Sequence, residues 1–320
     1  MTKLTHSTKP LTEPIPKKGF LHELKTHPVL FLMLTPAAVF FIINNYIPMV
    51  GIYYAFTRFN FQGGLFNSPF IGLENFRFLA ASGKLFSLTV NTICYNIAFI
   101  VISNLLQILF AVLLSQLTGK IFKKVNQSII FLPYFISYVV LNAVVYAVFN
   151  YDTGFLNTTL ISYGGTPVNV YGLPWVWRII MVVLYVWKNL GYGTVVYLAT
   201  ITGIDQELYE AARIDGANVF QQIRKITIPL LTPTFIILLL FALGGIMRGQ
   251  FDLFYQVIGN NGLLYEVTDI LDTYVYRTLK QNFDVGLGTA AGLYQSVIGF
   301  IIIMTTNFII RKKQPEYALF

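Results

Sequence analysis

Charged residues are scarce in this sequence, and histidine and cysteine are scarcer. Of the 320 residues, 11% are charged and 55% are hydrophobic, whereas a soluble domain carries about 25% charged residues. This composition excludes an intrinsically disordered chain and a nucleic-acid-binding domain, because both need many more polar and charged residues. The single cysteine, Cys94, excludes an intrachain disulfide and a zinc site built from cysteines. A protein whose surface faces lipid fits best, and the mean hydropathy of +0.63 agrees with this.

Motifs for catalysis and nucleotide binding are absent as well. The three histidines are His6, His22 and His27, and no HExxH sequence surrounds them. The fragment nearest to a Walker A sequence, Ser-Gly-Lys-Leu at 82–85, lacks the upstream glycine and the following serine or threonine. The sequence therefore predicts that the chain is not an enzyme and holds no cofactor or metal of its own.

Long stretches without Asp, Glu, Lys or Arg dominate the rest of the sequence. A helix that crosses a bilayer needs roughly 20 mostly apolar residues. The predicted spans are 29–50, 92–117, 127–149, 179–201, 234–254 and 287–310. We therefore expect an all-α polytopic membrane protein with a six-span transmembrane domain over 29–310, an N-terminal tail over 1–28 and a C-terminal tail over 311–320.

The distribution of basic residues predicts how these spans are oriented. With the N-terminus inside the cell, the cytoplasmic segments hold 14 of the 22 Lys and Arg residues, the outer segments hold seven, and Lys188 lies within the fourth span. Because basic residues gather on the cytoplasmic side of membrane proteins, this excess predicts that both termini are cytoplasmic.

The longest predicted cytoplasmic loop, 203–232, has the signals of two short helices. Asp205 is a suitable N-cap for the first helix, and Gly216 supplies the left-handed turn that ends it. Asn218 is placed to cap a second, amphipathic helix, which we expect Pro229 to end. Two helices that meet at a glycine form a knob that projects into the cytoplasm. The alternative is an ordinary loop that lies on the lipid headgroups.

A spaced motif lies within this loop. Glu-Ala-Ala at 210–212 is followed after three residues by Gly216, and after nine more by Ile-Thr-Ile-Pro at 226–229. This spacing resembles the EAA loop of permease subunits of bacterial binding-protein-dependent ABC importers, and it departs from that pattern only at Ile228, where leucine is usual. In that family the loop docks onto a separate ATPase. The resemblance thus assigns ATPase coupling to Glu210, Ala211, Ala212, Arg213, Asp215 and Gly216.

Other segments narrow the resemblance to carbohydrate importers. The sequences at 45–51 and 70–76 are similar to those of LplB-like and maltose-permease-like subunits, and the likeness extends over about 28–313. It implies the fold of a type I ABC importer permease in the bacterial cell membrane. The implied partners are a second homologous permease in a heterodimer, two copies of an ABC ATPase that bind ATP and Mg²⁺, and an extracytoplasmic solute-binding protein, but no nucleic acid.

Charged, aromatic and amide residues in spans four and five are candidates for a solute path. Lys188 and Arg248 lie at depths where a charge that faces lipid is costly. Tyr185, Asn189 and Tyr192 are spaced i, i+4 and i+7 and so share one helical face. The resemblance to the larger maltose permease subunit assigns sugar contacts to these three and to two positions in span five. The candidate path comprises Tyr185, Lys188, Asn189, Tyr192, Met247, Arg248 and Gln250.

Structural roles are the alternatives for these residues. Arg248 is spaced to pair with Asp252 one turn later, Lys188 to snorkel outward or to cap a carbonyl, and tyrosines are common at membrane interfaces. Lys188 has no evident acidic partner within the spans, so an anionic ligand would supply the missing charge.

The expected function is the import of oligosaccharides, including acidic ones, by alternating access that a partner ATPase drives. An ABC permease for another solute, such as a phosphorylated polyol, is the next hypothesis. A six-span secondary transporter or channel is less favoured, because proton-coupled carriers usually place acids within their spans and the predicted spans contain only Asp252, at an edge.

Overall fold

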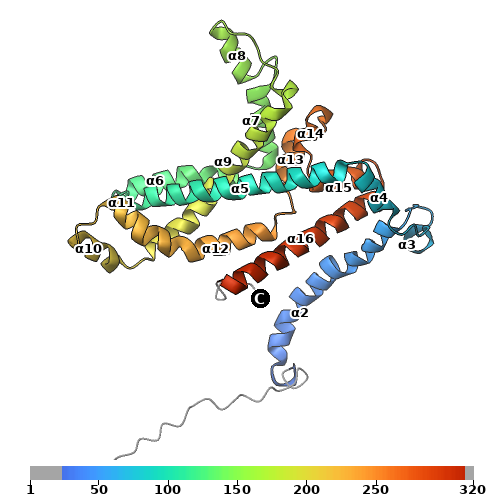
Figure 1. Cartoon of the computed structure of the whole chain (residues 1–320), viewed down its shortest axis with the longest axis horizontal. Helices are drawn as coiled ribbons and strands as arrows, with labels where there is room; N and C mark the ends of the chain where they lie inside the picture. Colours follow the sequence, from blue (N-terminus) through green and yellow to red (C-terminus); the bar gives the residue numbers. More distant parts are fainter. Residues whose placement is uncertain (1–23, 314–320) are drawn as a thin grey trace, which may run out of the picture. The chain divides into compact units, whose positions relative to one another are not determined.

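The computed structural model describes residues 24–313, and over this range the chain is built from helices. One isolated antiparallel bridge, between Thr57 and Phe70, is the only β-pairing among the described residues. The expected all-α fold is confirmed (Figure 1). The predicted tails over 1–28 and 311–320 lie mostly outside the described residues.

The chain divides into two units, of which the first ends at Ile52. Its described part starts with α2 (Pro28–Phe41), continues through a π-helical turn, η1 (Ile42–Tyr46), and enters the 3₁₀ helix η2 (Ile47–Phe56). The whole apolar run Pro28–Phe56 is long enough to cross a membrane, which agrees with the first predicted span.

The second unit, Tyr53–Phe320, contains the remaining long helices. They are α5 (Lys84–Ser115), α9 (Pro174–Thr202), α12 (Ile228–Gly244) and α16 (Val285–Lys313). The helices α5 and α9 pack along each other over much of their length, and α16 packs on both α12 and α15 (Leu271–Lys280). Apolar side chains such as Phe99, Trp177 and Phe254 fill the core between α5, α9 and α13 (Phe251–Ile258).

Shorter helices surround these long ones. They are α3 (Gly64–Asn67), α4 (Glu74–Ala81), α8 (Phe155–Ser162), η4 (Val170–Gly172), η6 (Gly262–Leu264) and α14 (Tyr265–Thr268).

The prediction of a continuous third span over 127–149 is wrong. The chain forms α6 (Lys120–Phe131) and a 3₁₀ turn, η3 (Leu132–Phe135), then bends by 95° into α7 (Tyr138–Phe149). Pro133 lies in the 3₁₀ turn, and the Ser137 side chain accepts a hydrogen bond from the Val140 amide, which starts a new helix. The hydropathy of this run gave no sign of the bend, although Pro133 lies within it.

The fifth span also differs from the prediction of 234–254. Its helical run is Val219–Gly244, and residues 245–250 are not helical before α13 begins. Two adjacent glycines, Gly244 and Gly245, end α12. Five helices in the described range are long and apolar enough to cross a membrane, and the bent pair of α6 and α7 makes a sixth span if it is counted as one.

Candidate coupling loop and solute path

The predicted knob is present and is built from local capping interactions. The Asp205 carboxylate accepts a hydrogen bond of 3.0 Å from the Glu207 amide at the start of α10 (Gln206–Ile214). Gly216 has a φ of +78°, the left-handed conformation expected of the turn that ends this helix. Asn218 and Gln221 then form a capping box at the start of α11 (Val219–Gln222). The prediction of two short helices that meet at Gly216 is confirmed.

The predicted end of the second helix at Pro229 is wrong. After α11 the chain passes through a π-helical turn, η5 (Ile223–Thr227), into α12, which has Pro229 in its first turn. Proline is tolerated there because a first-turn residue does not need to donate a hydrogen bond within its own helix. The loop is therefore continuous with the fifth span, through one helical run over Val219–Gly244.

The outer face of the knob has the properties of a protein contact surface. Glu210 is exposed and forms no ion pair with any described residue. The apolar side chains of Ile214 and Phe220 are 87% and 83% exposed. On the inner side, the Tyr209 hydroxyl lies 3.0 Å from the Thr227 hydroxyl and fixes α10 to the base of the span. Figure 1 shows α10 and α11 beyond the ends of α9 and α12.

Lys188 lies at the bend of the third span. Its ammonium donates hydrogen bonds to the carbonyl oxygen of Tyr134, at 2.8 Å, and to that of Ile136. It also lies 5.0 Å from the centre of the Tyr138 ring. The bend frees these carbonyls from helical bonding, and Lys188, only 7% exposed, satisfies them. Lys188 pairs with no acid among the described residues, and the alternative of a carbonyl cap is what the structure contains.

The other candidates on α9 contact two different elements. The Tyr185 ring stacks on Phe99 of α5 with ring centres 4.0 Å apart, and the Tyr192 ring stacks on Tyr134 of η3 at 5.3 Å. Between them, the backbone oxygen of Asn189 accepts a hydrogen bond from the side chain of Gln107. The three predicted residues thus lie along the surface of α9 that meets α5 and the bend.

Close approach of α9 to these neighbours depends on two glycines. A Cβ on Gly191 would lie 2.4 Å from the Cα of Phe131, and one on Gly193 would lie 2.1 Å from the Gln107 side chain. At Gly191 the neighbour is backbone, so only glycine fits, whereas at Gly193 the end of the Gln107 side chain would have to move. Sequence reasoning assigned no role to Gln107 or to these glycines, although a charged residue followed by two glycines in an apolar helix was an available signal.

The candidates from span five lie on the non-helical segment 245–250. Met247 is 2% exposed, whereas Arg248 is exposed and Gln250 is half-buried. Arg248 and Asp252 form no ion pair in the described part of the chain, because they do not lie on one continuous helix. The alternative of an Arg248–Asp252 pair one helical turn apart is therefore wrong.

Three polar side chains from other helices hold this segment. Asn96 of α5 donates to the carbonyl oxygens of Ile246 and Arg248, at 3.0 and 3.3 Å, and Gln295 of α16 donates to that of Met247 at 2.7 Å. The Asp272 carboxylate accepts from the Gly249 amide. Burial raises the pKa of Asp272, while the Gly249 amide and the Arg248 charge act in the opposite direction.

Helix α5 brings the two parts of the candidate path close together. Asn96 binds the span-five segment, and Phe99, three residues later on the same helix, stacks on Tyr185. Residues three apart on a helix are surface neighbours. The sequence placed the candidates of spans four and five on one path by their depth and by resemblance, and in the structure α5 contacts both groups.

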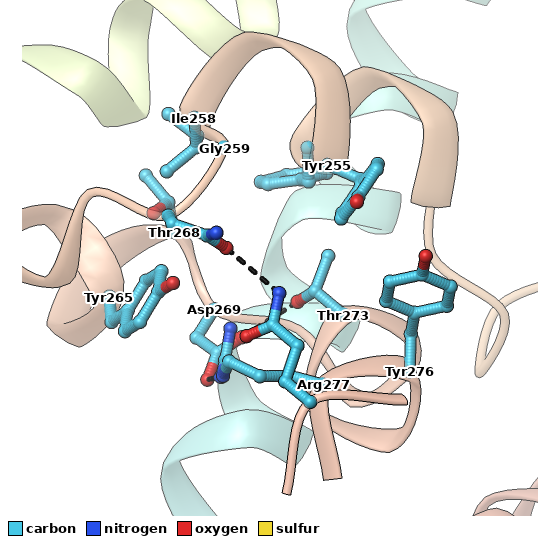
Figure 2. A pocket seen from close by; sticks show the side chains of 12 residues that line it. Tyr255, Ile258, Gly259, Tyr265, Thr268, Asp269, Thr273, Tyr276 and Arg277 are labelled. Atoms are coloured by element: carbon cyan, nitrogen blue, oxygen red, sulfur yellow. Dashed lines mark hydrogen bonds and ion pairs between the residues drawn. The ribbon is translucent and has the colours of Figure 1, made fainter. Parts of the chain in front are cut away.

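A second cluster of polar residues lies between α13, α14 and α15 (Figure 2). Arg277 pairs with Asp269, and its guanidinium lies 4.1 Å from the centre of the Tyr265 ring. Burial raises the pKa of Asp269, and the Arg277 charge lowers it. The free volume of about 10 Å³ is hardly enough for one water molecule. The ion pair links α15 to the end of α14, and the cluster leaves no room for a solute. Among the described residues, no group of three or more His, Cys, Asp or Glu side chains is placed to hold a metal ion.

Comparison with known proteins identifies the chain. Residues 107–314, more than half of the sequence, match the family described as "Binding-protein-dependent transport system inner membrane component". The chain belongs to this family. The resemblance drawn from the EAA motif is confirmed, and with it the type of fold.

Named relatives and solved structures of the family resemble this permease over most of its length. It is 31% identical to the polygalacturonan/rhamnogalacturonan transport system permease protein YteP of Bacillus subtilis, with 94% of this chain and 93% of YteP aligned. It is 30% identical to protein LplB of the same organism, over 93% of both chains. A crystal structure of a bacterial alginate ABC transporter, in complex with a periplasmic protein that holds an alginate pentasaccharide, matches with a TM-score of 0.82 and 30% identity, over 92% of this chain and 97% of the other.

Proposed function

We propose that this permease imports acidic oligosaccharides. The observation that carries the proposal is the near full-length likeness, at 30–31% identity, to one permease named for polygalacturonan and rhamnogalacturonan and to one solved with alginate present in its complex. Both names refer to polymers rich in sugar carboxylates. In this chain, Arg248 is the exposed cation on the candidate path, and it forms no ion pair with a described residue. A substrate carboxylate suits that position.

The energy for transport comes, in this proposal, from two copies of an ATPase that bind ATP and Mg²⁺. The permease itself has no phosphate-binding loop. Its exposed Glu210, with the apolar side chains of Ile214 and Phe220 nearby, provides a charged and hydrophobic contact for that partner. A second homologous permease completes the pathway. The basic residues favour cytoplasmic termini, which puts the knob on the side where ATP is available.

The proposed sugar contacts are Tyr185, Asn189, Tyr192 and Gln250. Aromatic ring faces pack on the C–H faces of sugars, and amides exchange hydrogen bonds with hydroxyls. Lys188 and the buried Met247 act on this path indirectly, because Lys188 holds the bend and Met247 packs in the core.

Reconstitution tests the proposal. The permease is co-expressed with the second permease and the ATPase of its transport system, purified as a complex and placed in liposomes with the binding protein and ATP. We expect uptake of an oligogalacturonate pentamer and slower uptake of maltopentaose. Uptake of glycerol 3-phosphate in place of either pentamer would establish the phosphorylated-polyol hypothesis. Uptake by the permease without the ATPase would contradict the ABC mechanism.

A further inference from the structure

A regular polar stripe follows the otherwise apolar helix α7. Tyr138, Asn142, Tyr146 and Asn150 occur at every fourth position, and all nine residues between them are Val, Leu, Ala or Phe. Four residues turn a helix by about 400°, so successive members of the stripe are offset by about 40° and lie on neighbouring parts of the surface. At its first residue the stripe meets Lys188, and from there it extends about 18 Å along the helix.

The outer part of this stripe forms one wall of a cavity of about 390 Å³. Asn142, Tyr146 and Asn150 line it from α7, Gln256 lines it from α13, and Tyr171 lines it from η4. Small-molecule sites have volumes of about 300–1,000 Å³. None of the residues that line the cavity is charged. Its polar chemistry is therefore that of amides and phenols.

Several hydrogen-bonding groups of the cavity are unused within the described part of the chain. The side chains of Asn142 and Gln256 make no hydrogen bond there, although both are half-buried. Asn150 and Asn169 accept bonds from nearby backbone amides through their side-chain oxygens, which leaves their NH₂ groups as donors. The Tyr171 ring is supported from behind by Trp177, with ring centres 4.8 Å apart.

The cavity lies at the end of α9 opposite to the coupling loop. Tyr171 precedes the first residue of α9, and α10 follows its last residue. A helix of 29 residues is roughly 43 Å long. With the knob in the cytoplasm, the cavity opens on the side where a binding protein delivers its solute.

We propose that this cavity is an entry site for the saccharide, and that the α7 stripe leads the saccharide from there to the path on α9. The amide NH₂ groups donate to sugar hydroxyl or carboxylate oxygens, and the rings of Tyr146 and Tyr171 offer stacking faces. The direction of movement rests on the proposed function. The binding of a saccharide in the cavity does not, because it follows from the lining groups alone.

Photolabelling of the intact complex tests the inference. The purified transporter in nanodiscs is irradiated with a galacturonic acid pentamer, or with maltopentaose, that carries a diazirine at its reducing end, and the labelled peptides are identified by mass spectrometry. We expect adducts within 142–171, reduced about 25-fold in a variant with Asn142→Leu and Gln256→Leu, because each lost amide contact weakens binding about fivefold. Tyr146→Ala, at an exposed position that tolerates truncation, is the second variant, and it should also reduce labelling.

Tyr163→Ala is the matched control. Tyr163 is 89% exposed in the same outer segment and does not line the cavity, so labelling and basal ATP hydrolysis should remain at the unmodified level. Labelling that avoids the cavity, or that none of the cavity variants reduces, would overturn the inference. It would also be overturned if sugar-free binding protein blocked the labelling and the variants weakened its attachment, because the cavity would then be a protein interface. Cavity labelling without import of any saccharide would instead contradict the proposed function and leave the entry site standing.

Discussion

Replacement of Lys188 by methionine distinguishes a structural lysine from a substrate-binding one. Methionine has nearly the same length and fills the same space, but it cannot donate to the carbonyl oxygens of Tyr134 and Ile136. Hydrogen bonds between helices in membranes contribute about 0.6–2 kcal/mol each, and those from charged donors contribute about 1.5–3 kcal/mol. Loss of two bonds from a charged donor should lower the free energy of unfolding by about 3–6 kcal/mol.

The expected consequences of Lys188→Met are local opening of the bend and a general loss of transport. Hydrogen exchange of residues 132–137 should accelerate, and uptake of an acidic and of a neutral pentasaccharide should fall by the same factor. Lys124→Met is the control, because Lys124 is exposed on the same bent span and binds no described acid. A selective loss of acidic uptake with unchanged hydrogen exchange would refute the structural reasoning and make Lys188 a ligand contact.

Three further predictions concern other parts of the permease. Glu210→Ala and Gly216→Pro should reduce uptake by whole cells at least tenfold if the knob couples to the ATPase. Expression should stay normal, because both residues lie outside the core. Uptake near the unmodified level in both variants would exclude a coupling role. Gly191→Ala should lower stability by about 1–3 kcal/mol, or prevent assembly, since its Cβ would collide with the Phe131 backbone; a thermal unfolding curve identical to that of the parent would show that α9 shifts freely. Because burial raises the pKa of Asp272, the folded state binds the carboxyl proton more tightly than the unfolded state does. The stabilisation from this proton is complete below the unfolded pKa of about 3.9 and is lost as pH rises through the folded pKa. Hydrogen-exchange protection of residues 245–250, corrected for intrinsic rates, should thus be greater at pH 5 than at pH 8, and Asp272→Asn should remove the difference.

The coupling loop was predictable because its determinants are local. Asp205, Gly216 and Asn218 each act within three residues of their own position, so the sequence contains the whole signal. The bend near Pro133 was not predictable from hydropathy, because the run around it carries no charge and reads as one span.

The partners of the candidate path were not predictable either, for a different reason. Asn96 and the Arg248 carbonyl that it binds are 152 residues apart, and nothing local connects them. The Lys188 interaction was not predictable for two reasons. Its acceptor carbonyls are distant in sequence, and they become available only because of the bend. Sequence reasoning therefore singled out positions on α9 but did not identify the neighbours of the Lys188 charge.

The Lys188 interaction also has a consequence for the order in which the chain enters the membrane. The carbonyl of Ile136 emerges from the ribosome 52 residues before the lysine that binds it. At about 5–20 residues per second, that delay lasts roughly 3–10 s. A bend with unsatisfied carbonyls is costly in lipid. The α6–α7 pair therefore gains the partners of these carbonyls only when α9 is present, and we expect the two spans to reach their final positions together.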